Sequence, residues 1–225
     1  MDKKDYALFE NYMLSCMRDA AHDKEHIYRV LFNALIIAQT ESNVDYDVLI
    51  TACLLHDIGR EEQFKNPAID HAEYGGEMAR EFIVKNGYAK DFAERVKSCI
   101  VTHRFRKSNP PATTEAKILF DADKLDVTGA MGIARTLVYK ATVDEPLYRL
   151  DGNGMPTDGS NDTEPSFFGE YKYKLEKLYD KFYTQKAREL ASGRASAAKA
   201  FYDSLYSEVE QTYANGKHLI NELVK

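Results

Sequence analysis

The sequence predicts an all-α protein, and three observations support this fold class. Apolar residues recur every three or four positions through most of the 225-residue chain, which is the period of an amphipathic helix. Residues that commonly cap helices stand at the ends of several of these stretches. No alternation of apolar and polar residues is long enough for a useful strand, and no internal repeat is visible. We therefore expect one domain built as a helical bundle.

Four helices are expected in the first part of the chain, each defined by an apolar face: residues 1–20, 23–39, 45–55 and 70–85. Asp23 suits the N-cap of the second helix, because a carboxylate there accepts hydrogen bonds from free backbone N–H groups. Asn86-Gly87 closes the fourth helix as a C-cap. Residues 60–69 are polar, include Pro67 and are expected to form a loop.

Three further helices are expected at residues 90–103, 113–120 and 127–141. Pro110-Pro111 prevents the first of them from continuing, and Thr113 or Thr114 can cap the next. A polar insertion rich in Gly, Asn and Asp follows at residues 142–165. A loop of this length is usually a functional lid or partly disordered. It lacks the ligand alternation and terminal Glu of an EF-hand, so we do not expect a calcium site there.

The amphipathic pattern returns after the insertion, at residues 168–190 and 196–223. Because Ser192-Gly193 separates the two stretches, they are expected to form a C-terminal helical hairpin packed on the core. The predicted organisation has four successive parts. These are an N-terminal helix (residues 1–20), a metal-binding core (21–141), a polar loop or lid (142–165) and the hairpin (166–225).

Composition narrows the class of protein. The net charge of −6 argues against a nucleic-acid-binding surface, which needs an excess of Lys and Arg to neutralise phosphates. Three scattered cysteines, in no metal or redox spacing, indicate a reducing compartment. No apolar run approaches the ~18 residues that suggest a membrane span, and no secretory signal is visible. The sequence therefore predicts a cytoplasmic protein with no membrane or nucleic-acid partner, and a homodimer stays open.

The pair His56-Asp57 follows a buried apolar stretch and precedes Gly59, whose permissive backbone allows the chain to turn there. With His26 and Asp123, the pair makes a set of two imidazoles and two carboxylates. Such a mixed site suits Mn²⁺, Fe²⁺, Co²⁺, Ni²⁺, Zn²⁺ or Mg²⁺. Each residue has a plainer interpretation: His26 as an ordinary core or surface histidine, Asp57 as a turn cap, and Asp123 as part of an acidic patch. Together they favour a divalent metal site.

Several segments resemble the HD superfamily of metal-dependent phosphohydrolases, and within it a subgroup of small bacterial HD-domain proteins. The matching segments are residues 22–30, 55–60, 121–126, 129–135, 174–178 and 184–188. The resemblance covers about residues 20–210 and implies an HD-domain bundle. It also implies that His26, His56, Asp57 and Asp123 hold the metal. His22-Asp23 precedes a helix and is interpreted as a cap region. Because the subgroup includes nucleotide pyrophosphohydrolases, the resemblance implies a nucleoside triphosphate as substrate.

Other residues near the motif are candidates for catalysis and substrate binding. Some nucleotide-cleaving HD enzymes use a Glu as general base where this chain has Arg60, so that role cannot be transferred. Glu61 and Glu62 are displaced by one or two residues from the required position. Arg60 is better suited to a phosphate oxygen, because guanidinium offers bidentate geometry. His71 and His103 either line the pocket or hold a second metal.

Four further cations are candidates for binding phosphate: Lys124, Arg104, Arg106 and Arg135. We expect a mononuclear site in which a metal-activated hydroxide attacks phosphorus. Lys124, Arg60 or His103 would stabilise developing charge, and Asp57 would orient the water. His71, Arg104 and Arg135 are expected to contact the small phosphorylated substrate. Three alternatives stay open: a cyclic-nucleotide or other phosphodiesterase, a nucleotide-binding module that does not cleave, and a dinuclear iron oxygenase.

Overall fold

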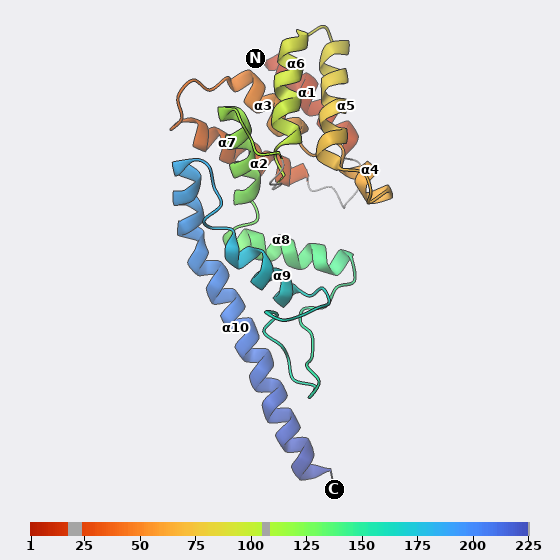
Figure 1. Cartoon of the computed structure of the whole chain (residues 1–225), viewed down its shortest axis with the longest axis vertical. Coiled ribbons are helices and arrows are strands. Elements are labelled where there is room, and N and C mark those ends of the chain that lie inside the picture. The colour runs from red at the N-terminus through yellow and green to blue at the C-terminus, as the bar shows by residue number, and fades with distance from the viewer. Residues whose placement is uncertain (18–23, 105–108, 225) are drawn as a thin grey trace. The chain divides into compact units, whose positions relative to one another are not determined.

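The computed structural model describes residues 1–17, 24–104 and 109–224. These residues form helices and loops, with one isolated antiparallel bridge between Leu150 and Pro156, so the predicted all-α class is confirmed (Figure 1). The chain divides into two compact units. The first comprises Met1–Asp126 with Tyr183–Ala187, and the second comprises Val127–Phe182 with Arg188–Lys225. Within the described residues, no helix is both long and apolar enough to cross a membrane.

The first unit contains seven helices among its described residues: α1 Lys3–Cys16, α2 Lys24–Ala38, α3 Tyr46–Leu55, α4 Arg60–Lys65, α5 His71–Lys85, α6 Lys90–Val101 and α7 Thr114–Leu125. Asp45, Asp70 and Thr113 act as N-caps, each accepting a hydrogen bond from the first turn of its helix. The C-cap predicted at Asn86-Gly87 is confirmed, and Gly87 adopts φ +87°. The predicted cap Asp23 lies outside the described residues.

Helix α3 is the centre of the first unit. Its residues Val48 to Leu55 include buried side chains on every face, as expected for a helix surrounded by others. It contacts α1, α2, α5, α6 and α7, and α5 and α6 pack side by side (Figure 1). Because the sequence reaches His56-Asp57 as this buried helix ends, both side chains are carried into the interior.

The loop predicted at residues 60–69 is wrong in its first half, where α4 forms from Arg60 to Lys65. The charges of this short helix stabilise it, since Glu61 and Glu62 lie in the first turn and Lys65 in the last. Lys65 Nζ lies 2.6 Å from Glu61 Oε1 and 3.0 Å from Glu62 Oε1. Pro67 lies beyond the C-cap residue Asn66, so it does not interrupt the helix.

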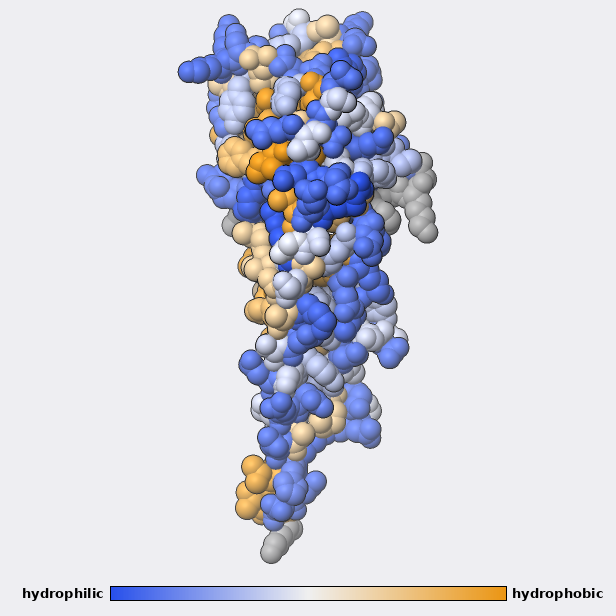
Figure 2. All heavy atoms as spheres, turned by 90° about the vertical axis from the view of Figure 1, so that its left-hand side faces the viewer, coloured by the Kyte–Doolittle hydropathy of each residue, from blue (hydrophilic) through white to orange (hydrophobic). Residues whose placement is uncertain are grey.

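The second unit contains α8 Gly129–Thr142, α9 Phe167–Tyr173, a 3₁₀ helix Leu175–Lys177 and most of α10 Gln185–Leu223. Its core is aromatic: the rings of Tyr171 and Tyr202 stack at 4.1 Å, and Phe168 meets Tyr202 edge to face. Apolar side chains at the C-terminal end of α10 are exposed (Figure 2), among them Ile220 and Leu223.

The predicted C-terminal hairpin is wrong. Helix α10 continues through Ser192-Gly193 as one element of 39 residues, and the helical structure is interrupted before Gln185 instead. A single glycine inside a helix costs only about 1 kcal/mol, and the alanines on both sides of Gly193 favour helix enough to compensate.

The insertion 142–165 is held by its own polar groups. The Asp151 carboxylate accepts hydrogen bonds from the backbone N–H groups of Asn153 and Met155, both at 2.8 Å. Thr157 donates its backbone N–H to the carbonyl of Arg149 at 2.9 Å and its hydroxyl to Asp162 at 2.6 Å. The segment is therefore a set of defined turns, and its use as a lid stays a prediction.

Candidate metal centre

Six side chains gather inside the first unit from segments far apart in the sequence. His26 lies in the first turn of α2, His56 and Asp57 follow α3, and Asp123 lies in the last turn of α7. His71 begins α5 and His103 follows α6. All are buried except Asp123, whose side chain is one-quarter exposed. Every position is at or near a helix end, so the site is built where several helices converge.

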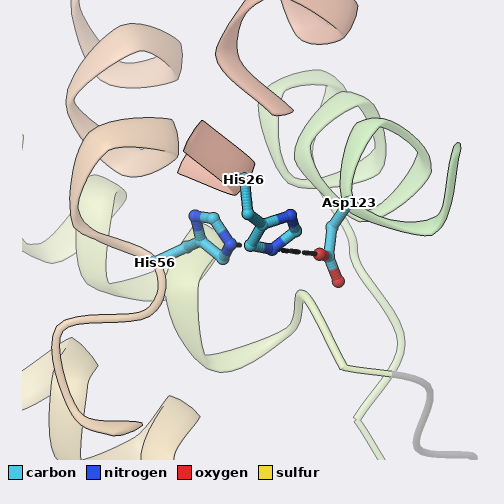
Figure 3. Close-up of side chains that lie close together, drawn as sticks. All are labelled: His26, His56 and Asp123. Carbon is cyan, nitrogen blue, oxygen red and sulfur yellow. Dashed lines mark ion pairs between the residues drawn. The ribbon is translucent and has the colours of Figure 1, made fainter. Parts of the chain in front are cut away.

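The first group consists of His26, His56, Asp57 and Asp123, three of which are drawn in Figure 3. Asp123 Oδ1 lies 3.2 Å from His26 Nε2 and 3.9 Å from His56 Nε2. Asp57 Oδ2 lies 3.6 Å and 3.7 Å from the same two nitrogens. Ligands about 2.0–2.2 Å from one ion lie at most about 4.4 Å from each other, so this spacing fits a shared divalent ion.

The second group consists of Asp57, His71 and His103. Asp57 Oδ1, the oxygen not used by the first group, lies 3.4 Å from His71 Nε2 and 3.6 Å from His103 Nε2. The two imidazole nitrogens are 3.3 Å apart. Ligand atoms of these three residues lie within 4.8 Å of one another, as do those of His26, His56 and Asp123. Asp57 therefore faces both groups, one through each oxygen.

All four imidazoles present Nε2 to the carboxylates, because Nδ1 is hydrogen-bonded elsewhere. Nδ1 of His26 contacts Asp126 Oδ2 at 2.8 Å, and Nδ1 of His56 contacts the carbonyl of Cys53 at 2.8 Å. Nδ1 of His71 contacts Gln63 Oε1, and Nδ1 of His103 contacts the carbonyl of Ile100 at 2.6 Å. An oxygen acceptor at Nδ1 favours the proton there and leaves the Nε2 lone pair available, which is the arrangement of metal-ligating histidines.

The charge states suit metal ligands, which must be neutral imidazoles and ionised carboxylates. Burial lowers the pKa of His56 to about 4 and that of His71 to about 3. Burial alone would raise the pKa of Asp57, but the positive charge of Arg60 and contacts with His56 and His103 hold it well below its usual range. The pKa of Asp123 is also lowered, since its contact with His26 outweighs burial.

Among the described residues, His56 Nε2 and Asp57 Oδ1 are buried ligand atoms that lack a hydrogen-bond partner. A buried polar atom without a partner typically costs about 1–3 kcal/mol, and more when it is charged. Both atoms point toward the centre of the cluster, where a cation would satisfy them. The residues present therefore fit a divalent cation.

Gly59 brings the His56-Asp57 turn against α5. A Cβ at this position would lie 2.4 Å from the carbonyl oxygen of His71 and 2.7 Å from the backbone nitrogen of Gly75. The sequence analysis expected Gly59 to supply conformational freedom, yet its φ is −86°, which any residue can adopt. Glycine is needed for the close approach of two backbones, and this approach places Asp57 beside His71.

The cations predicted to bind substrate have different surroundings. Arg60 Nε donates to Asp57 Oδ2 at 2.5 Å, while the Arg60 side chain is 45% exposed, so it joins the cluster to solvent. Arg104 donates to Asp70 at 3.1 Å beside the start of α5. Lys124 places its ammonium 4.1 Å from the centre of the Phe120 ring. The catalytic role predicted for Lys124 stays a prediction.

The remaining predictions concern residues that do not contact the cluster in the part of the chain that the structure describes. Arg135 belongs to α8 in the second unit, and its role in substrate binding stays a prediction. Arg106 lies outside the described residues. The alternative bases Glu61 and Glu62 both form ion pairs with Lys65.

The sequence analysis missed the residues that orient the histidines. Asp126 accepts from His26 Nδ1 and is itself held by Arg29, whose Nε donates to Asp126 Oδ1 at 2.7 Å. Gln63 accepts from His71 and lies in α4, which was expected to be a loop. The spacing of three residues places Asp126 near Asp123, but it does not indicate which histidine Asp126 contacts.

Asp121, which precedes Asp123 by two residues, has a structural role. Its carboxylate accepts hydrogen bonds from the backbone N–H groups of Tyr183 and Thr184 and from the Thr184 hydroxyl, at 2.7–3.1 Å. It therefore holds the short segment Tyr183–Ala187 on the first unit. The three aspartates of residues 121–126 therefore have different roles. Asp123 is a candidate ligand, Asp126 positions His26, and Asp121 makes a structural contact.

We expect Asp126→Ala to weaken Mn²⁺ binding by about 10- to 100-fold, because His26 loses the acceptor that fixes its ring and tautomer. Asp126→Asn should restore part of the affinity, since its amide oxygen can still accept from Nδ1. Titration of metal-free protein measures the effect, and Asp203→Ala, which removes an exposed carboxylate from α10, is the matched control. Equal affinities for Asp126→Ala and wild type would contradict the positioning role.

Comparison with known proteins gives a consistent result. A family model described as HD domain matches residues 24–128. The uncharacterized protein YpgQ of Bacillus subtilis strain 168 is 30% identical over 194 residues, covering 84% of this chain and 85% of YpgQ. The crystal structure of YpgQ matches with a TM-score of 0.71 at 27% identity, over 92% of this chain and 96% of that one.

Two further solved structures extend the comparison. A crystal structure of Bacillus subtilis YpgQ in complex with ADP matches with a TM-score of 0.70 at 27% identity, over 91% of this chain and 97% of that one. A predicted HD superfamily hydrolase from an uncultured Thermotogales bacterium matches with a TM-score of 0.59 at 29% identity, over 89% and 90% of the two chains.

Proposed function

Because this chain belongs to the HD domain superfamily, we propose that it is a metal-dependent phosphohydrolase whose substrate is a nucleotide. The favoured reaction is the cleavage of a nucleoside triphosphate with release of pyrophosphate. One observation carries the proposal: four imidazole Nε2 atoms face two ionised carboxylates in a buried cluster, and each Nδ1 is hydrogen-bonded to an oxygen.

His26, His56, Asp57 and Asp123 would hold the first ion. When bound, a divalent ion supplies Lewis acidity toward a phosphate oxygen and lowers the pKa of water toward neutrality. The protein supplies the orientation, because the Nδ1 hydrogen bonds fix the rings of His26 and His56 before any ligand arrives. The buried surroundings also exclude bulk water and strengthen every charge interaction in the site.

Arg60 is the cation best placed to bind substrate phosphate. Its guanidinium already contacts the cluster through Asp57, yet nearly half of its side chain is exposed. The guanidinium would hold a phosphate oxygen of the substrate, because phosphate and carboxylate offer it the same paired oxygen geometry. Arg104, held by Asp70, would supply a second positive charge beside His71. His103 would hold a phosphate oxygen or an ion through Nε2.

The nucleotide substrate is supported by the relative YpgQ, which crystallises with ADP and shares the fold over nearly its whole length. A diphosphate matches the chemistry of the cluster and its neighbouring guanidinium groups. A substrate panel tests the proposal: pyrophosphate release from a nucleoside triphosphate with Mn²⁺, Co²⁺, Ni²⁺ or Mg²⁺ supports it. Cleavage of cyclic nucleotides alone would favour a phosphodiesterase, and nucleotide binding without product would favour a binding module.

A second ion at Asp57, His71 and His103 is supported by the unpartnered, buried Asp57 Oδ1 that faces both imidazoles. In place of the mononuclear site expected from the sequence, we therefore propose that saturated wild-type protein binds two Mn²⁺ ions per chain. The double variant His71→Ala, His103→Ala should bind one, because the first group keeps its four ligands. Metal analysis after gel filtration measures both, with His218→Ala on exposed α10 as control.

One ion in the wild type and one in the double variant would contradict the second site. His71 and His103 would then be free to bind phosphate oxygens. Oxygen uptake by protein loaded with two irons, without phosphohydrolase activity, would instead favour an oxygenase.

A further inference from the structure

Helix α4 has two faces with different partners. Arg60 and Gln63, three residues apart, reach Asp57 and His71 in the cluster. Lys65 forms ion pairs with Glu61 and with Glu62 elsewhere on the helix. Since residues three and four apart share a helix face, Phe64 neighbours both Arg60 and Glu61 and lies at the edge of the cluster-facing side, one turn beyond Arg60. An aromatic ring therefore follows Arg60 by one turn, at the edge of the side of α4 that meets the cluster.

Phe64 is unusually exposed. With 76% of its surface accessible, it is the most exposed large apolar side chain among the described residues of the first unit. Burying a Phe side chain typically stabilises a protein by about 1.5–3 kcal/mol, so leaving the ring in water sacrifices stability. The other residues of α4 are polar and suited to solvent, so the helix itself does not require an aromatic residue there.

We propose that Phe64 is the platform on which the base of the nucleotide substrate stacks. The inference rests on the proposed function, because it takes the phosphates to lie at Arg60 and the metal cluster. Residues 60 and 64 are separated by about 6 Å along the helix axis, from a rise of 1.5 Å per residue. A ribose spans a distance of this order between its phosphate and its base.

In this arrangement the phosphate and the base of a nucleotide are recognised by different side chains. Arg60 binds phosphate through charge, while Phe64 offers a ring to any base, because every base has a π-face. Stacking of this kind distinguishes a nucleotide from inorganic polyphosphate but discriminates weakly among bases. Phe64 thus selects for a nucleoside, and the cluster with Arg60 selects for a phosphate chain.

The chain contains no tryptophan, so Phe64→Trp introduces a single reporter at the proposed platform. With Mn²⁺ present, ADP should change the fluorescence of this variant saturably, and inorganic pyrophosphate should not. Phe32→Trp, at an aromatic position of α2 that is 57% exposed, is the matched control and should not respond to either ligand.

Calorimetry supplies the second measurement. Phe64→Ala should weaken ADP binding by about 5- to 10-fold, the lower range for loss of one base–aromatic stack, and leave pyrophosphate binding unchanged. Because the ring is exposed, its removal should not lower the melting temperature. Phe32→Ala should bind both ligands as the wild type does.

The possible results separate the two proposals. If Phe64→Ala binds ADP as tightly as the wild type does, and Phe64→Trp shows no fluorescence response, the platform proposal is overturned. The hydrolase proposal is then unaffected. A wild type that binds neither ADP nor pyrophosphate and hydrolyses no nucleotide overturns both. An equal loss of ADP and pyrophosphate affinity in Phe64→Ala also overturns the platform, because it shows damage to the phosphate site.

Discussion

Asp57→Ala is expected to remove metal binding from both groups and to reduce nucleotide hydrolysis by about a thousandfold or more. Asp57 faces His26 and His56 through one oxygen and His71 and His103 through the other. Its loss deprives both groups of a carboxylate. A bound ion supplies several kcal/mol of transition-state stabilisation, and each 1.4 kcal/mol is a factor of ten in rate.

The same substitution has a readout that does not depend on activity. Mn²⁺ at 100 times its dissociation constant should stabilise the wild type by about 2.7 kcal/mol, because the ion binds the folded state. Asp57→Ala should show no such gain, while Asp203→Ala should behave as the wild type. Retained turnover, or a metal-dependent rise in melting temperature equal to that of the wild type, would contradict the assigned role of Asp57.

Gly59→Ala is the second substitution with a large expected effect. The new Cβ would meet the carbonyl oxygen of His71 at 2.4 Å and the backbone nitrogen of Gly75 at 2.7 Å, and backbone atoms cannot rotate away. We expect a loss of at least about 1–3 kcal/mol of unfolding free energy, as for overpacking of a core. The turn must move away from α5, so Asp57 should separate from His71 and metal binding should weaken.

The control for this substitution is Gly152→Ala, where a Cβ meets nothing within 4 Å. Chemical denaturation and Mn²⁺ titration of both variants measure stability and affinity together. If Gly59→Ala matched Gly152→Ala in both measurements, the close contact would not be what positions Asp57.

Much of the fold could be predicted from local signals. The helices of the first unit follow apolar periodicity, and Asp45, Asp70 and Thr113 cap them through hydrogen bonds within their own first turns. The errors occurred where local signals were weak. Helix α4 is short and has no apolar face of its own, and the Ser192-Gly193 break was outweighed by helix-forming neighbours.

The candidate ligands of the site could be predicted from the sequence, but the residues that orient them could not. His26, His56, Asp57 and Asp123 were found because their residue types and order carry the chemistry, and the structure brings them together. Their role as ligands stays a proposal. Asp126 and Gln63 were missed because their roles depend on which nitrogen of a distant histidine they meet. Tertiary contacts of this kind are not encoded in local spacing.

The most direct test of the central claim is a crystal of this protein soaked in Mn²⁺ and measured for anomalous scattering. The account predicts a strong peak within about 2.3 Å of Nε2 of His26 and His56 and of carboxylate oxygens of Asp57 and Asp123. A peak only elsewhere on the molecule, or no peak in this cluster at saturating Mn²⁺, would contradict it.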